Sequence, residues 1–173
     1  MVNYLKNNLL TGYRITPIRK LKFSLYLTII FALIAFLVGY KGNLYQIHIL
    51  DERTACVLLI SLFLFPSLLE ESFFRGILIP NTTKKKGQKA ILGFTLLSAS
   101  LFTIWHPLNT LTINPSAQEF FLNPYFLLIV FCLGIICSLS YIYSRSLWVP
   151  IIIHWLTTVI WVIFLGGRNL ILE

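Results

Sequence analysis

The chain has 173 residues, of which 57% are hydrophobic and 12% charged, and its formal net charge is +8. A soluble domain is about 45–50% apolar and about 25% charged, so the composition excludes an ordinary water-soluble domain of this size. The positive charge does not indicate nucleic-acid binding, because the lysines and arginines form short clusters between apolar runs. Such clusters are typical of loops on the cytoplasmic side of a membrane.

Five apolar segments are long enough to cross the bilayer, which takes roughly 20 apolar residues per helix. Backbone in lipid must form its hydrogen bonds internally, so each segment is predicted to be an α-helix. The expected spans are 23–40, 54–80, 90–108, 124–143 and 148–165. The predicted fold is an all-α, polytopic transmembrane helical bundle with about five spans. We expect an N-terminal segment (1–22) followed by a membrane domain (23–173), with a motif-bearing core at about 54–166.

Basic residues indicate the orientation of these spans. Five precede the first span, four lysines fill the link at 81–89, and Arg145 separates the last two spans. The opposite side holds only Lys41, Arg53 and Arg168. The positive-inside rule therefore predicts an integral membrane, multi-pass protein with residues 1–22 in the cytoplasm. After five spans, the C-terminus is expected outside.

The second apolar segment contains three charged residues within six positions, Glu70, Glu71 and Arg75. A charge at the bilayer centre costs about 2.5–3.5 kcal/mol on insertion scales, so these residues need an explanation. Glu71 and Arg75 are four residues apart with the acid first, which favours a structural ion pair. This pairing leaves Glu70 without a local partner. Two adjacent carboxylates cannot both ionise freely at low dielectric, so one is expected to hold a proton.

Two histidines, His106 and His154, lie in or at the ends of later apolar segments. Either one alone is typical of a hydrogen-bonded core histidine. Together with Glu70 they could activate water, because a carboxylate can act as general base and imidazoles can relay protons, bind metal or stabilise an oxyanion. Intramembrane Glu and His also form proton relays in transporters, but the sequence lacks the paired, interrupted segments of inverted repeats.

Counting residues raises one difficulty for this site. At 1.5 Å rise per residue from the lysine cluster, His106 is expected nearer the outer face than Glu70 and His154. Helix tilt, or a bend at Pro66, would have to bring the three side chains to one level.

Three stretches of the chain are EESFFRG at 70–76, FTIWH at 102–106 and SRSLWVPIIIH ending at His154. They resemble the motifs of a known family, the CAAX prenyl protease type II or CPBP family of intramembrane proteases. EESFFRG at 70–76 resembles the first motif, two glutamates, three residues and an arginine. FTIWH at 102–106 resembles the second motif, F-x-x-x-H, and SRSLWVPIIIH ending at His154 resembles the approach to the third, H-x-x-x-N or H-x-x-x-D. The resemblance covers about 62–163, with the motifs in the family's order. It departs at Thr158, where the family usually has Asn or Asp.

The resemblance implies a catalytic site of six residues. They are Glu70, Glu71, Arg75, His106, His154 and Thr158. The first glutamate and first histidine would activate the catalytic water, and the second histidine and the threonine would stabilise the oxyanion. The second glutamate and the arginine would orient the site. The family suggests that this site opens to the cytoplasmic side.

By the same resemblance, the protein would be an endopeptidase that cuts a lipidated (CAAX-like) or membrane peptide. Its partners would be this peptide and the lipid bilayer, with no nucleic acid and no cofactor. One alternative is a zinc ion bound by Glu70, His106 and His154, since zinc accepts such ligands. Another is a non-catalytic or weakly catalytic membrane scaffold or bacteriocin immunity-type protein of the same family, and the departure at Thr158 would be a sign of lost activity.

Overall fold

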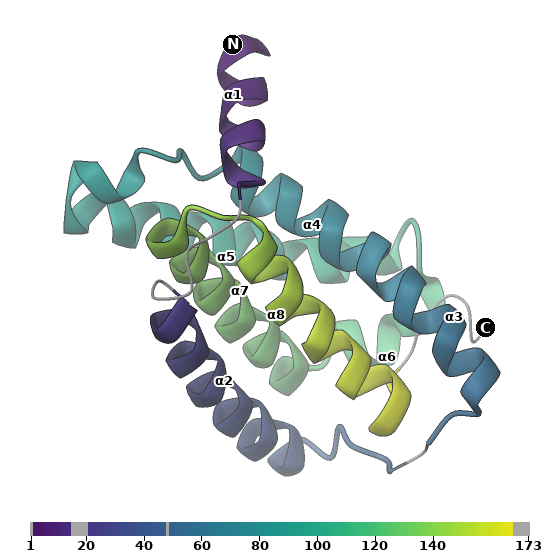
Figure 1. Cartoon of the computed structure of the whole chain (residues 1–173). Helices are drawn as coiled ribbons and strands as arrows, with labels where there is room; N and C mark the ends of the chain where they lie inside the picture. The colour runs from purple at the N-terminus through teal and green to yellow at the C-terminus, as the bar shows by residue number, and fades with distance from the viewer. Residues whose placement is uncertain (1, 15–20, 48, 168–173) are drawn as a thin grey trace.

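The computed structural model describes residues 2–14, 21–47 and 49–167, and within them the chain forms a bundle of helices (Figure 1). The predicted all-α class is therefore confirmed. In chain order the α-helices are α1 (Val2–Gly12), α2 (Leu21–Lys41), α3 (Glu52–Leu62), α4 (Leu69–Glu71), α5 (Gln88–Thr110), α6 (Gln118–Phe121), α7 (Pro124–Ser144) and α8 (Trp148–Val159). The π-helical segments are Phe63–Leu68, Ser72–Ile77 and Ile160–Phe164, and the 3₁₀ turns are Thr83–Lys86 and Pro115–Ala117.

Among the residues that the structure describes, four helical stretches are long and apolar enough to cross a membrane. They are Leu21–Lys41, Glu52–Ile77, Gln88–Thr110 and Pro124–Ser144. The fifth expected span is the shorter apolar helix Trp148–Phe164. At 1.5 Å per residue it is about 25 Å long, against about 30 Å for the hydrocarbon core, so it lies at the lower limit of span length. The helical membrane bundle agrees with the prediction, with four full-length spans and one short one.

Local sequence signals explain where these helices begin and end. Asp51 caps α3 by accepting a hydrogen bond from Thr54 N at 3.0 Å. Hydrogen bonding to the side chain of Thr54, and secondly to its backbone N–H, lowers the pKa of the Asp51 carboxyl. Asn123 caps α7 in the same way, with Pro124 at the first helical position. Arg145 ends α7 in a left-handed conformation with φ +60°.

The second span is not a continuous α-helix. Phe65 has extended backbone angles (φ −139°, ψ 119°), and the following Pro66 has no N–H to donate to the helix. The helix resumes at Leu69, so the short α4 places both glutamates directly after the interruption. The bend considered at Pro66 is therefore present.

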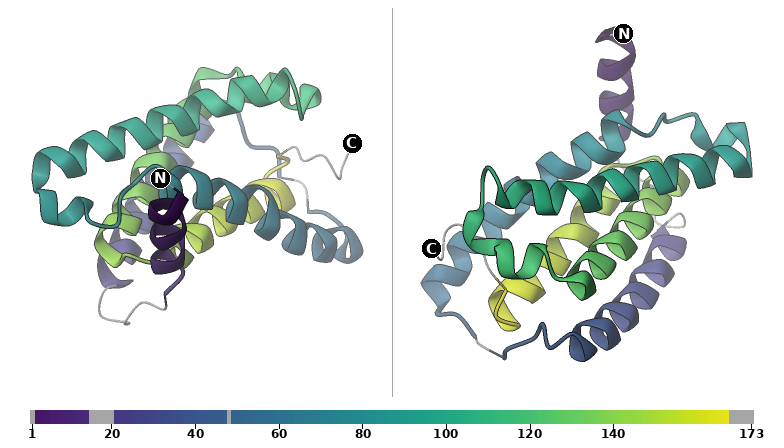
Figure 2. Two further views of the ribbon diagram at one scale, coloured as in Figure 1. Left: turned by 90° about the horizontal axis from the view of Figure 1, so that it is seen from above. Right: turned by 180° about the vertical axis from the view of Figure 1, so that it is seen from behind.

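The central helix of the bundle is α7. It packs against α5, α2 and α8, and Figure 2 shows it between α5 and α2. Gly134 permits the close approach to α5, because a Cβ at this position would lie 3.0 Å from the Ala99 Cα.

The N-terminal helix α1 stands out from the bundle (Figure 1) yet is fixed to the end of the second span. The buried Asn8 amide donates to Gly76 O at 2.6 Å and Ile79 O at 3.0 Å, and Asn8 Oδ1 accepts from Asn81 N at 2.8 Å. The sequence patterns did not predict this helix, because its 11 residues mix polar and apolar types and are too few for a span.

Candidate active site

Three helical segments supply the six expected site residues. The second span carries both glutamates and the arginine, α5 carries His106, and α8 carries His154 and Thr158. The structure brings these segments together: α8 packs beside the Pro66 bend, and α7 packs against both α5 and α8.

A buried ion cluster forms around Glu71. Its Oε1 accepts hydrogen bonds from Arg75 Nη1 and from His154 Nδ1, both at 2.9 Å. The side chains of Glu71 and Arg75 are fully buried, and that of His154 is 2% exposed. Arg75 Nη2 also donates to Gly134 O at 3.1 Å, and its guanidinium carbon lies 4.5 Å from the Phe102 ring centroid. The Glu71–Arg75 pair was expected, whereas the bond from His154 was not.

Glu70 has different surroundings from its neighbour. Its Oε1 accepts a hydrogen bond from Trp105 Nε1 at 3.0 Å, and its Oε2 has no hydrogen-bond partner among the described residues. Sequence reasoning missed Trp105, although this residue directly precedes His106 within the second motif. Glu70 therefore has one fixed carboxylate oxygen and one that can accept a new partner.

Both histidine rings contact the Phe102 ring edge to face. The ring centroid of His106 is 4.9 Å from that of Phe102, and the centroid of His154 is 5.5 Å from it. His106 Nδ1 lies 2.9 Å from Phe102 O, and a carbonyl only accepts, so this nitrogen carries the hydrogen. The lone pair of neutral His106 is then on Nε2.

Glu70, His106, His154 and Thr158 all line one cavity of about 540 Å³. Its walls are mainly apolar, and α2 contributes to them through residues such as Phe31. Pro66 also lines this cavity, so the bend in the second span lies at the site itself. Residue counting placed His106 nearer the outer face than Glu70 and His154, yet all three side chains line the same cavity.

Thr158 lines the cavity, but its hydroxyl already donates a hydrogen bond within its own helix. Its Oγ1 donates to the backbone of its own helix, to Trp155 O at 3.0 Å and His154 O at 3.2 Å. A hydroxyl has one hydrogen to donate, so it would have to leave these carbonyls to reach an oxyanion. Sequence reasoning treated the hydroxyl as free, and this local bond weakens its expected role.

The zinc alternative finds no ready site in the described ranges 2–14, 21–47 and 49–167. No group of three or more His, Cys, Asp and Glu side chains there is arranged to hold a metal ion. His106 and His154 each donate a hydrogen bond through Nδ1, which leaves Nε2 of each ring as the nitrogen that could bind a metal. Glu70, His106 and His154 line the same cavity, and the zinc alternative stays a prediction. The absence of a cofactor from the reaction stays a prediction.

Comparison with known families adds a decisive observation. Residues 52–160 match the family model of the type II CAAX prenyl endopeptidase Rce1-like proteins. The chain belongs to this family. No curated protein and no solved structure matches the chain significantly. The expected CAAX protease type of membrane protein is thus confirmed at the level of the family.

The Rce1-like region begins at α3 and contains all six site residues. Helices α1 and α2 precede it. Yet α2 covers part of the cavity, and α1 bonds to the end of the motif-bearing span. Both helices therefore adjoin the site from outside the matched region.

Proposed function

We propose that this Rce1-like protein is an intramembrane endopeptidase, which hydrolyses a peptide bond in a lipidated (CAAX-like) or membrane peptide. The observation that carries the proposal is the shared cavity, into which one carboxylate and two imidazoles converge. Water activated by these groups is the nucleophile.

Glu70 is the general base. Glu71 Oε2 also has no hydrogen-bond partner among the described residues, but Glu71 does not line the cavity and its Oε1 is bound by both Arg75 and His154, so it cannot easily take this role. Glu70 Oε2 has no partner within the described chain and lies beside a cavity that can admit water. A base must lie within hydrogen-bonding reach of the proton it takes, and Glu70 and His106 Nε2 can share one water between them.

His154 stabilises the oxyanion. Its Nδ1 donates to Glu71 Oε1, which fixes the orientation of the ring, and a protonated ring also donates from Nε2. Water loses a proton to Glu70 as its oxygen attacks the carbonyl carbon, and the carbonyl oxygen becomes the oxyanion. Glu70 then passes this proton to the leaving amine as the C–N bond breaks, giving a carboxylic acid and an amine.

The cavity walls support the proposed substrate class. A cavity of about 540 Å³ with mainly apolar walls suits a lipid-modified or apolar peptide better than a polar one. Because the bundle spans the membrane, such a peptide reaches the site without leaving an apolar environment.

The test is the substitution Glu70→Gln in the full-length protein. The amide keeps the shape and still accepts from Trp105, but it cannot take a proton. We expect cleavage of a prenylated CAAX-type peptide to fall by about 10²–10⁴-fold, the usual contribution of a general base. The control Glu52→Gln, at an exposed position at the start of α3, should cleave like the wild type. A thermal melt checks folding, and equal cleavage by folded Glu70→Gln would exclude the mechanism.

A weakly catalytic scaffold is the second candidate, and the engaged hydroxyl of Thr158 favours it. Thr158→Asn restores the longer amide that the family usually has there. In an active protease this change should leave the cleavage rate unchanged or raise it. Cleavage by Thr158→Asn together with none by the wild type would support the scaffold.

A further inference from the structure

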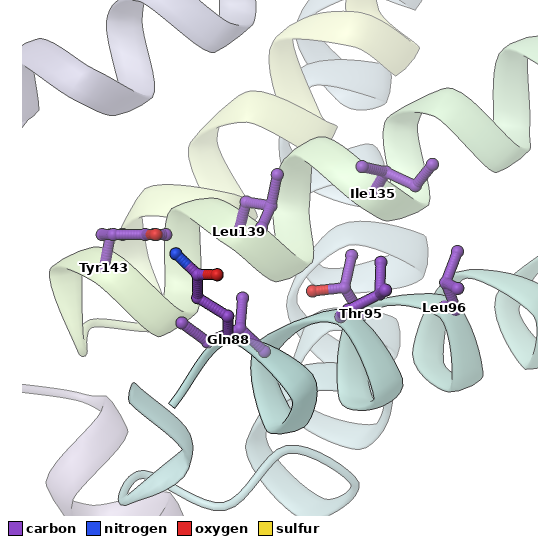
Figure 3. Close-up of a pocket in the computed structure, with 8 residues that line it drawn as sticks. Gln88, Thr95, Leu96, Ile135, Leu139 and Tyr143 are labelled. Carbon is purple, nitrogen blue, oxygen red and sulfur yellow. The ribbon is translucent and has the colours of Figure 1, made fainter. Parts of the chain in front are cut away.

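A second hollow lies between α5 and α7 and shares no lining residue with the cavity at Glu70. It has a volume of about 230 Å³. Figure 3 shows side chains of both helices along it, and the labelled ones are Gln88, Thr95, Leu96, Ile135, Leu139 and Tyr143. We call this hollow the α5–α7 groove.

The groove has the length and polarity of an acyl-chain site. Ile135, Leu139 and Tyr143 recur every fourth residue on one face of α7, so the groove follows about 12 Å of helix. On the α5 side, Leu92 and Leu96 are 61% and 41% exposed. In a bundle that spans the membrane, this exposed apolar surface faces lipid chains.

One end of the groove is strongly basic. The Nζ of Lys84 lies 4.6 Å from the Tyr143 ring centroid, and Lys85, Lys86 and Lys89 are exposed next to it. No acidic residue occurs in 81–110 or in α7 to neutralise these charges. Helix α5 begins at this end without a side-chain cap, so its first N–H groups add to the positive potential.

One buried polar atom lies deeper in the groove. Thr95 is 4% exposed, and within the described part of the chain its Oγ1 has no hydrogen-bond partner. A plain hydrocarbon chain would leave this hydroxyl unsatisfied, whereas a lipid also brings ester oxygens that can accept from it.

We propose that the α5–α7 groove binds an anionic phospholipid from the leaflet that contacts the 81–89 link. The phosphate lies at Lys84 and the start of α5, and one acyl chain follows the groove past Thr95. Basic sites between transmembrane helices bind anionic head groups by this complementarity of charge. The lysines select the head group, and the apolar groove selects a lipid over a soluble phosphate. The proposal is independent of proteolytic activity.

The experiment is a lipid titration of the full-length protein in neutral detergent, read by thermal melting. A ligand that binds the folded state raises the melting temperature with its concentration, which gives an apparent affinity. The added probes are phosphatidylglycerol, phosphatidylcholine with identical acyl chains, and glycerol 3-phosphate. We expect stabilisation by phosphatidylglycerol, with little effect of the other two.

Two variants address the two halves of the site. Lys84→Gln/Lys89→Gln should weaken phosphatidylglycerol binding by about fivefold per lysine, as expected for basic residues near an anionic membrane surface. Leu92→Trp should fill the groove and weaken binding as well. All three positions are exposed, so the variants should fold. The controls are Lys41→Gln at the opposite end of the bundle and Leu97→Trp, which is 50% exposed on α5 outside the groove.

Equal stabilisation by phosphatidylcholine would overturn the proposed selectivity for an anionic head group. Equal stabilisation by glycerol 3-phosphate would show an ion site without a lipid. Unchanged phosphatidylglycerol binding in both groove variants would place the lipid elsewhere on the protein.

Discussion

The two adjacent glutamates differ in what surrounds each carboxylate. Glu71 is fully buried and one of its oxygens accepts from both Arg75 and His154, whereas Glu70 accepts one bond from Trp105. Removing one partner of a buried ion pair leaves the other charge uncompensated, which typically costs about 3–5 kcal/mol. The two residues should therefore respond differently to the same change.

We expect Glu71→Gln to lower the melting temperature of the purified protein far more than Glu70→Gln does. The amide cannot neutralise Arg75, while at Glu70 it still accepts from Trp105. Exposed Glu52→Gln is the control, and it should change stability by no more than about 0.5 kcal/mol. Equal melting temperatures for Glu71→Gln and the control would show that the buried cluster is not a stabilising feature.

At the scale of elements, α1 holds the end of the motif-bearing span through Asn8. Three hydrogen bonds join Asn8 to Gly76, Ile79 and Asn81, and each contributes about 0.5–1.5 kcal/mol net. Tyr13 OH adds a hydrogen bond of 2.5 Å to Ser72 Oγ, next to Glu71 in the chain.

Asn8→Ala should therefore loosen α1 and the turn at 76–81, which hydrogen exchange would detect as faster exchange of their amides. Asn7→Ala is a matched control, because Asn7 is the exposed neighbour on the same helix. Exchange in Asn8→Ala that matches the control at both segments would mean that α1 is held by other contacts.

Sequence predicted the apolar membrane helices and the Glu71–Arg75 pair, but it predicted neither α1 nor the contacts between site residues that lie far apart in the chain. Apolar length was sufficient for the spans, since lipid leaves the backbone few choices. The contacts Glu71–His154 and Glu70–Trp105 join residues 83 and 35 positions apart, so they depend on packing that periodicity does not encode. The engaged hydroxyl of Thr158 is a local effect, and threonine's tendency to bond backward within a helix could have predicted it.

For the whole molecule, the proposed orientation places the 81–89 link and α1 in the cytoplasm. Residue Ile47, 88% exposed in the link after α2, would then lie outside. We expect a membrane-impermeant maleimide to label Ile47→Cys in intact cells, and Lys85→Cys only after permeabilisation. Both variants carry Cys56→Ala, because Cys56 is an exposed free thiol. The reverse labelling pattern would invert the proposed topology.

The spacing of Glu71 and Arg75 also bears on how the chain is made. Their ion pair closes within one turn of a single span, so it can form before α7 and α8 have been synthesised. An unpaired arginine at this depth would hinder transfer from the translocon into lipid, and the neighbouring carboxylate removes that obstacle. His154 is added to the pair only when the last apolar helix arrives, so the order of synthesis matches the order in which the buried cluster is assembled.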